Sequence, residues 1–195
     1  MEKSRIRPHC LVTELFQLFN LDTSLDMVLE VSMYKLNQYM DSERSSIFVF
    51  DPLNKQLTSY SSLDLAKLEI RMSKSTGVAG WVFEHRLPAV INNAYDDSRF
   101  YRGVDDMTGF RTRNMICMPI IDDSGKCLGT IQSLNKKSGD FTTDDLELLD
   151  VTARLVVVAQ NKNKCYDEIL TTNITCGKFE LDCLLNWRSL PEAAN

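Results

Sequence analysis

Two stretches of the chain carry apolar residues at the three- and four-residue spacing of a helix. From Thr23 to Met40 this spacing predicts an amphipathic helix, and Thr23, three residues before Asp26, predicts a variant capping box at its start. A second stretch begins at Thr142, with acidic residues in its first turn, where they interact favourably with the helix dipole. It predicts a long helix that runs past Cys165.

Two pairs of strand-like segments lie between these helices. Ser45–Asp51 and Leu57–Leu63 are rich in strand-forming residues and flank a turn, so they predict a β-hairpin. Asn114–Asp122 and Cys127–Lys136 predict a second hairpin, in which Gly125 occupies a turn position that favours a positive φ.

Shorter segments complete the pattern between the two hairpins. Leu68–Ser73 alternates apolar and polar residues, as a half-buried strand does. Val78–Arg86 predicts a short helix that Ser75 or Thr76 caps and Pro88 ends. The order helix, strands, short helix, strands, helix predicts an α+β fold, an antiparallel sheet with helices packed on one face and long terminal helices.

Length and charge restrict the classes of protein to which this fold can belong. The 195 residues, 44% hydrophobic and 25% charged, suffice for one sizeable domain with additional helices at its ends. A net charge of -5 argues against a nucleic-acid partner or an electrostatic membrane surface. No apolar run has the length of a signal peptide or a membrane span, so we expect a soluble, cytoplasmic protein.

The segment VDDMTGFRTRN, Val104–Asn114, is unusually polar for a position directly before a strand. Its charged side chains predict either a surface ion-pair lattice that orders a long loop or part of a ligand pocket. Its threonine hydroxyls predict either local turn bonds or ligand contacts. The charged residues are Asp105, Asp106, Arg111 and Arg113, and the threonines are Thr108 and Thr112.

Three motifs give the chain a resemblance to GAF domains: TGVAG at Thr76–Gly80, YRGVDDMTGFRTRN at Tyr101–Asn114 and LGTIQSLNKK at Leu128–Lys137. With the order of the elements, they make about Leu21–Asn161 similar to the cyclic-nucleotide-binding GAF domains of animal phosphodiesterases and related adenylyl cyclases. We therefore expect a GAF-type fold.

The family's Asn-Lys, Phe, Asp-Glu signature appears here as Asn135, Lys136, Phe141 and Asp145. Leu146 stands where the family has glutamate. The resemblance implies that Lys136 and Asp145 bridge the end of a strand to the final helix, so this signature concerns the integrity of the scaffold more than contact with the ligand.

The resemblance also implies a cyclic nucleotide, cAMP or cGMP, as the ligand, with no cofactor. The N–H groups of Val78 and Ala79, at the start of the short helix, would receive the phosphate. Tyr60 would flank the base and Tyr101 would close over it as a lid. The ten residues that the resemblance assigns to the ligand site are Ser46, Tyr60, Ser61, Val78, Ala79, Tyr101, Asp105, Thr108, Thr112 and Gln132.

Ser61 bears on the choice of base. The cyclic-GMP-selective family member has aspartate at this position, a carboxylate suited to the N1 and N2 donors of guanine. Serine removes that charged partner and leans the expectation toward cAMP. Thr108 and Thr112 would supply hydroxyls to the phosphate and ribose, and Gln132 stands where that family member has glutamate near the sugar.

The ends of the chain predict its partners. We divide the chain into a helical segment 1–21, a GAF domain 22–161, and a helix extension with linker 162–195. Apolar residues of Leu11–Phe19 and the end of the last helix predict a homodimer through the terminal helices. RSLPE, Arg188–Glu192, resembles the linker to the catalytic domain of such a phosphodiesterase, so we expect allosteric control of a phosphodiesterase or cyclase output domain.

Two other readings remain open beside this one. A GAF module that serves dimerisation, or senses another small molecule, would bind no cyclic nucleotide. Some small GAF proteins reduce methionine sulfoxide with cysteines, which keeps Cys117 and Cys127 as candidates for an enzymatic alternative. We expect neither a catalytic site nor a metal site, because two histidines are too few for a phosphodiesterase metal cluster and the six cysteines lack CxxC spacing.

Overall fold

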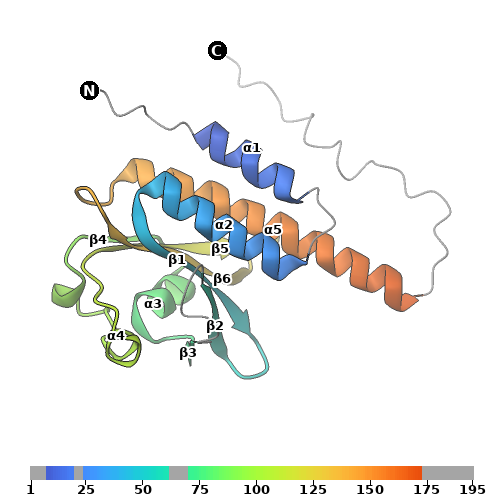
Figure 1. Cartoon of the computed structure of the whole chain (residues 1–195). Helices are drawn as coiled ribbons and strands as arrows, with labels where there is room; N and C mark the ends of the chain where they lie inside the picture. The colour runs from blue at the N-terminus through green and yellow to red at the C-terminus, as the bar shows by residue number, and fades with distance from the viewer. Residues whose placement is uncertain (1–7, 20–23, 62–69, 173–195) are drawn as a thin grey trace, which may run out of the picture.

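The computed structural model describes residues 8–19, 24–61 and 70–172 (Figure 1). For Tyr60, Ser61 and residues 162–172, the backbone alone is described. The helices are α1 (Pro8–Phe19), α2 (Leu25–Met40), α3 (Gly77–His85), α4 (Gly103–Thr108) and α5 (Thr143–Thr172), with a 3-10 turn η1 at Ala94–Asp96. The strands are β1 (Ser42–Asp51), β2 (Gln56–Ser61), β3 (Arg71–Ser73), β4 (Ala89–Ile91), β5 (Met115–Ile121) and β6 (Cys127–Lys136).

The six strands form one antiparallel sheet in the order β3-β2-β1-β6-β5-β4. Both predicted hairpins, β1–β2 and β5–β6, are confirmed. The two hairpins meet where β1 pairs with β6, and there Ser46 lies opposite Gln132. This pairing brings the first half of the domain beside the second.

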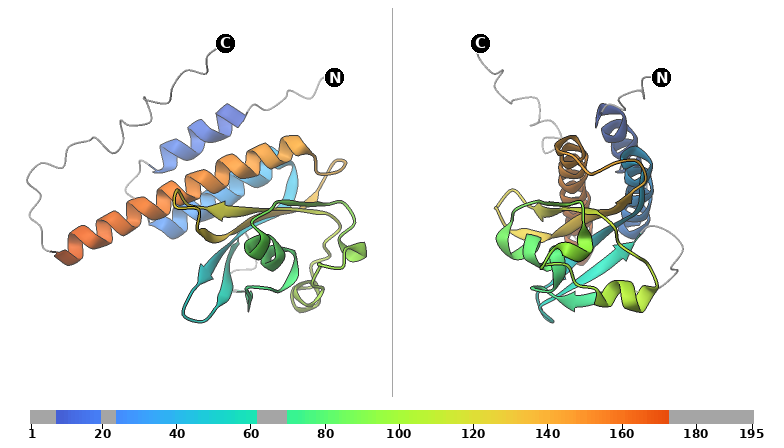
Figure 2. Two further views of the ribbon diagram at one scale, coloured as in Figure 1. Left: turned by 180° about the vertical axis from the view of Figure 1, so that it is seen from behind. Right: turned by 90° about the vertical axis from the view of Figure 1, so that its left-hand side faces the viewer.

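The long helices α2 and α5 cover one face of the sheet, and α1 packs on these two helices, which confirms the predicted α+β architecture (Figures 1 and 2). Alternation along the strands sends Ile47, Ile116 and Ile131 toward these helices, where all three are fully buried. The apolar cluster on this side of the sheet is larger than the cluster on the other side. Because apolar burial is the main stabilising contribution, most of the stability of the domain comes from this side.

The opposite face of the sheet carries the short helices α3 and α4 and the loops around them (Figures 1 and 2). Phe48, Met115 and Cys117 point to this side and form a second apolar cluster with Val78 and Val82 of α3. The sheet is therefore buried on both faces, and the smaller layer is the one that contains most of the residues predicted to bind a ligand.

The structure corrects two predicted helix caps. Ser24, not Thr23, caps α2 by accepting a hydrogen bond from the N–H of Met27, and Thr23 lies outside the described residues. Thr76 is the N-cap residue of α3, but its side chain makes no capping hydrogen bond. The first turn of α3 therefore keeps N–H donors that no side-chain cap satisfies.

Other boundaries agree more closely with the sequence. Helix α5 does continue past Cys165, to Thr172. The predicted strand at Leu68–Ser73 is described only from residue 70, and β3 itself spans Arg71–Ser73. Gly125 has the expected positive φ of +80° in the β5–β6 turn.

The family signature ties β6 to α5 as the resemblance implies. Lys136 forms an ion pair with Asp145, whose carboxylate also accepts a hydrogen bond from the N–H of Thr142 at 2.8 Å. Asn135 has a left-handed φ of +56°, and its amide donates to Glu43 and accepts from the N–H of Arg113. Asparagine suits this position because it tolerates a positive φ and offers both a donor and an acceptor.

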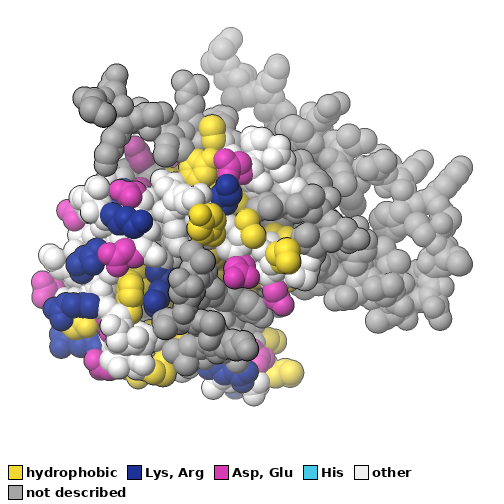
Figure 3. All heavy atoms as spheres, in the orientation of Figure 1, with side chains coloured by type: hydrophobic (Ala, Val, Ile, Leu, Met, Phe, Trp, Pro, Cys, Tyr) yellow, Lys and Arg dark blue, Asp and Glu magenta, His cyan; other side chains and the backbone are white. Residues whose placement is uncertain are grey.

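Basic and acidic side chains are interspersed over the described surface in Figure 3. This face shows no single field of positive charge such as binds nucleic acid. Within the described residues, no helix combines the length and hydropathy needed to cross a bilayer.

Candidate functional site

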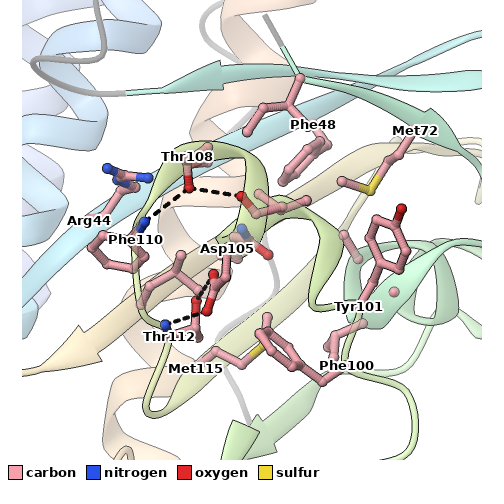
Figure 4. Close-up of a pocket in the computed structure, with 18 residues that line it drawn as sticks. Arg44, Phe48, Met72, Phe100, Tyr101, Asp105, Thr108, Phe110, Thr112 and Met115 are labelled. Atoms are coloured by element: carbon pink, nitrogen blue, oxygen red, sulfur yellow. Dashed lines mark hydrogen bonds between the residues drawn. The ribbon is translucent and has the colours of Figure 1, made fainter. Parts of the chain in front are cut away.

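A pocket opens on the face of the sheet opposite the long helices (Figure 4). Strands β1 and β6 form its floor, and α3, α4 and the segment that joins them form its walls. It encloses about 770 Å³ of space, including the solvent at its open mouth. Most of its wall is apolar, with a few polar side chains directed inward, as is usual for small-molecule sites.

Eight of the ten residues assigned to the site from the sequence line this one pocket. They come from four separate parts of the chain: Ser46, Val78, Ala79, Tyr101, Asp105, Thr108, Thr112 and Gln132. The side chains of the other two, Tyr60 and Ser61, lie outside the described part of the chain. The Cα of Ser61 pairs with Ser46 across the β1–β2 hairpin, so its backbone lies beside the pocket floor.

The start of α3 forms one end of the pocket. Gly77, Val78 and Ala79 all line the cavity, and Gly77 has a positive φ of +69°. The first N–H groups of a helix have no carbonyl partner one turn earlier, and Thr76 does not cap them. This end of the pocket therefore offers backbone donors and the positive end of the helix dipole.

Tyr101 lies at the mouth of the pocket near α3, and its side chain is 51% exposed. It packs between two glycines. A Cβ on Gly77 would lie 3.2 Å from the Cβ of Tyr101, and one on Gly103 would lie 2.4 Å from its ring. The two glycines thus make room for an aromatic ring at the position where the sequence predicts a lid.

Asp105 lines the pocket and is also bonded within the protein. The side chain is buried, and its carboxylate accepts the Thr112 N–H at 2.6 Å and the Thr112 hydroxyl at 2.8 Å (Figure 4). It also accepts the Tyr95 hydroxyl at 3.1 Å. These bonds hold the segment after α4 against the helix, so Asp105 fixes this part of the pocket wall.

The hydroxyls of the two threonines have local partners. Thr108 donates to the carbonyl oxygen of Val104 at 2.8 Å and accepts from the N–H of Phe110 at 3.3 Å, and Thr112 donates to Asp105. The local hydrogen bonds that the sequence allows for these hydroxyls are therefore formed. Both residues line the pocket, and because each hydroxyl proton is already donated, the hydroxyl can offer a ligand a lone pair but not its proton.

The ion-pair lattice that the sequence allows in this segment is not formed. Between the four charged residues of 105–113, the described structure contains no ion pair. Arg113 pairs instead with Glu43 at 2.7 Å, and the Arg111 guanidinium lies 4.8 Å from the centre of the Tyr95 ring. Both arginines therefore support the backbone around the pocket, and neither of them lines it.

Arg44 and Phe110 are among the pocket residues that were not assigned to the site from the sequence. The Arg44 guanidinium lies 4.1 Å from the centre of the Phe110 ring. Burial lowers the pKa of Arg44, and the nearby Asp105 and Glu43 carboxylates oppose this effect. Strand alternation gives the signal that finds Arg44, because it stands two residues before Ser46 and must share its face.

The two cysteines on the sheet, Cys117 and Cys127, do not resemble reactive centres. Cys117 is fully buried, and burial raises the pKa of its thiol to about 12. Burial also raises the pKa of Cys127. Among the described residues, no group of three or more His, Cys, Asp or Glu side chains is arranged to bind a metal ion.

We expect native protein treated with iodoacetamide at pH 8 to be alkylated at the exposed Cys10 and spared at Cys117. With a pKa of about 12, Cys117 is thiolate in only about one molecule in ten thousand at this pH. Peptide mass spectrometry measures both sites in one sample, and urea-denatured protein is the control. Equal alkylation of the two cysteines in the native state would contradict the burial described above.

The fold is that of an α+β module with a pocket on one face of its sheet. Residues 24–160 match the sequence profile of the GAF domain, so the chain belongs to the GAF domain family.

Cyclic nucleotide phosphodiesterases are among its relatives. The chain is 31% identical over 166 residues to a protein of Caenorhabditis elegans described as a probable 3',5'-cyclic phosphodiesterase, pde-5. It is 29% identical over 147 residues to the dual 3',5'-cyclic-AMP and -GMP phosphodiesterase 11A of Takifugu rubripes. These matches cover 78% and 67% of this chain but only 22% and 16% of the relatives, so the chain spans about a fifth of their length.

Solved structures confirm the fold. The GAF domain of a phosphoenolpyruvate-protein phosphotransferase from Coxiella burnetii superimposes with a TM-score of 0.72 at 16% identity, over 84% of this chain and 99% of that domain. The free methionine-R-sulfoxide reductase of Neisseria meningitidis gives a TM-score of 0.68 at 14% identity, over 82% and 91%. At such low identity, the similarity concerns the fold alone.

Proposed function

We propose that this GAF domain binds a cyclic nucleotide and has a regulatory role, with no catalytic site of its own. One observation carries the proposal: eight residues assigned to a cyclic-nucleotide site from the sequence line a single pocket. They lie as much as 86 positions apart in the chain, between Ser46 and Gln132, so only the fold brings them together.

The phosphate would bind at the start of α3. The Val78 and Ala79 N–H groups would donate to its oxygens there, and the helix dipole would favour the negative charge without a buried lysine. Gly77 allows the backbone to approach closely because it has no side chain. Tyr101, at the mouth beside them, would cover the nucleotide.

The ribose and base would occupy the rest of the pocket. The Thr108 and Thr112 oxygens have lone pairs that would accept a hydrogen bond from the ribose hydroxyl. Phe48, Phe110 and Met115 provide apolar surface for a flat purine. Ser46 and Gln132, opposite one another on β1 and β6, would face its polar edge.

Regulation would follow from the position of the domain within a larger protein. The phosphodiesterase relatives are several times longer than the matched region, so the output that we propose is a phosphodiesterase or a cyclase. A homodimer through the terminal helices is part of this proposal. Leu11 and Leu15 of α1 are buried within the chain, so they cannot supply its interface, whereas Val158 of α5 is an exposed apolar residue. Binding would then change the orientation of the output domains by a coupling free energy.

Melting temperature in the presence of cAMP or cGMP tests the proposal. After denaturation and refolding to remove bound ligand, nucleotide at about 100 times its Kd is expected to add about 2.7 kcal/mol to the free energy of unfolding. For a protein of this size, that is an increase of about 5–10 °C. AMP and GMP, which lack the cyclic phosphate, are the ligand controls.

A variant links this shift to the pocket. Thr112→Val is expected to weaken nucleotide binding about tenfold in calorimetric titration, because it removes a polar group from the wall and one of the three hydrogen bonds to Asp105. Thr58→Val, on β2 outside the pocket, is the matched control. A folded wild type that gains no stability from either nucleotide would favour the alternative, a dimerisation or sensor module.

A further inference from the structure

Arg44 forms the end of the pocket opposite α3. Along β1, Arg44, Ser46 and Phe48 face the cavity in turn, and Figure 4 places Arg44 and Tyr101 on opposite sides of it. The guanidinium lies over the face of Phe110, 4.1 Å from the ring centre. Stacking on an aromatic ring restricts the plane of the guanidinium, so its donors are partly oriented before any ligand arrives.

The carboxylates nearest to Arg44 already have other donors. Asp105 accepts hydrogen bonds from Thr112 and Tyr95, and Glu43 pairs with Arg113 and accepts from the Asn135 amide. Within the described residues, the Arg44 guanidinium has no hydrogen bond or ion pair, only its contact with Phe110. A half-buried cation without acceptors is unfavourable, and a ligand that supplies acceptors relieves that cost.

The two ends of the pocket make different demands on a cyclic nucleotide. The uncapped start of α3 suits the single phosphate, and the ligand has no second phosphate for Arg44. With the phosphate at α3, the purine would extend toward Arg44 between the aromatic walls. The guanidinium would then face an edge of the base.

We propose that Arg44 determines the base specificity of the site by donating to O6 and N7 of guanine, so that the pocket prefers cGMP. This inference rests on the proposed function. Guanine presents two adjacent acceptors, which match two parallel N–H groups of arginine. Adenine presents N7 beside an amino donor, so one guanidinium N–H would face another donor.

Arg44 therefore reverses the preference for cAMP inferred from Ser61. Serine at position 61 removes a carboxylate that reads the N1 and N2 edge of guanine in a cyclic-GMP-selective relative. Arg44 acts on the other edge of the base, where the difference between guanine and adenine is equally clear. Discrimination through arginine needs no carboxylate at position 61.

Calorimetric titration of the full chain, refolded free of ligand, with cGMP, cAMP and 7-deaza-cGMP tests this assignment. The wild type is expected to bind cGMP on the order of 10- to 100-fold more tightly than cAMP. Arg44→Met should bring cGMP down to the affinity of cAMP and change cAMP binding less than about threefold. The control is Arg154→Met, which removes an exposed arginine of α5 far from the pocket.

The 7-deaza analogue tests the same contact without a variant, in case Arg44→Met does not fold. Loss of N7 should weaken binding to the wild type about fivefold or more and leave Arg44→Met unaffected. Preference of the wild type for cAMP would overturn the Arg44 assignment while leaving the proposed function intact. Equal weakening of both nucleotides by Arg44→Met would assign the arginine to the phosphate instead. No binding of either nucleotide would overturn both proposals.

Discussion

Asp105→Asn is expected to lower the free energy of unfolding by about 3 kcal/mol, because hydrogen bonds to a charged acceptor are each worth about 1.5–3 kcal/mol. The buried carboxylate receives two bonds from Thr112 and one from Tyr95. An amide keeps one acceptor oxygen and places an NH₂ donor against at least one of these donors. Urea denaturation followed by circular dichroism measures the loss.

The neighbouring carboxylate supplies the matched control for this prediction. Asp106 is exposed, belongs to the same turn of α4 and carries the same charge, so Asp106→Asn should change stability by less than about 0.5 kcal/mol. Tyr95→Phe removes only one of the three bonds and should cost about 1.5 kcal/mol. If Asp105→Asn were as stable as Asp106→Asn, the buried carboxylate would not be holding the pocket wall.

The same variant separates positioning from ligand contact. The Asp105 carboxylate accepts a hydrogen bond from the backbone N–H of Thr112. Loss of this carboxylate would therefore let the whole segment after α4 move. If Asp105 acts only through that segment, saturating nucleotide should restore much of the lost stability, because the ligand rebuilds the wall from inside. A direct contact of Asp105 with the ligand would instead abolish that rescue.

The elements of this fold follow from local patterns in the sequence. The helical spacing in α2 and α5 and the strand-forming residues of the two hairpins predict the correct elements, because both depend on residues close in the chain. The residue that caps a helix is less well determined by the sequence. Serine and threonine are both good N-cap residues, so residue type alone does not distinguish Ser24, which caps α2, from Thr23.

The site depends on contacts that no local pattern contains. Only the resemblance to a known family predicts that Ser46, Ala79 and Gln132 share one site, because they lie on three elements that are far apart in the sequence. The role of Asp105 depends on how the chain turns back after α4 to present Thr112 to it. Arg44 was not assigned to the site because the resemblance assigns Ser46, and not Arg44, on this strand. Its contact with Phe110 forms only when the loop that carries Phe110 is folded.

Lys136→Met is expected to destabilise the domain by about 3–5 kcal/mol, because it leaves the largely buried carboxylate of Asp145 without its cation. The exposed fractions of the two side chains are 16% and 9%. Asp145 also accepts from the N–H and hydroxyl of Thr142, directly before α5, so its charge holds the first turn of the helix. Thermal and urea denaturation of the variant measure the loss.

Two further variants test whether burial of the ion pair, and not its charge alone, causes the loss of stability in Lys136→Met. Arg154→Met breaks an exposed pair with Asp150 on the same helix, and should cost less than about 0.5 kcal/mol. The double variant Lys136→Met/Asp145→Leu should be more stable than Lys136→Met, because it removes the isolated carboxylate, although it still lacks the bonds to Thr142. A double variant less stable than both single variants would mean that the charge of Asp145 is satisfied without Lys136. The link between β6 and α5 would then depend on packing around Phe141 rather than on the ion pair.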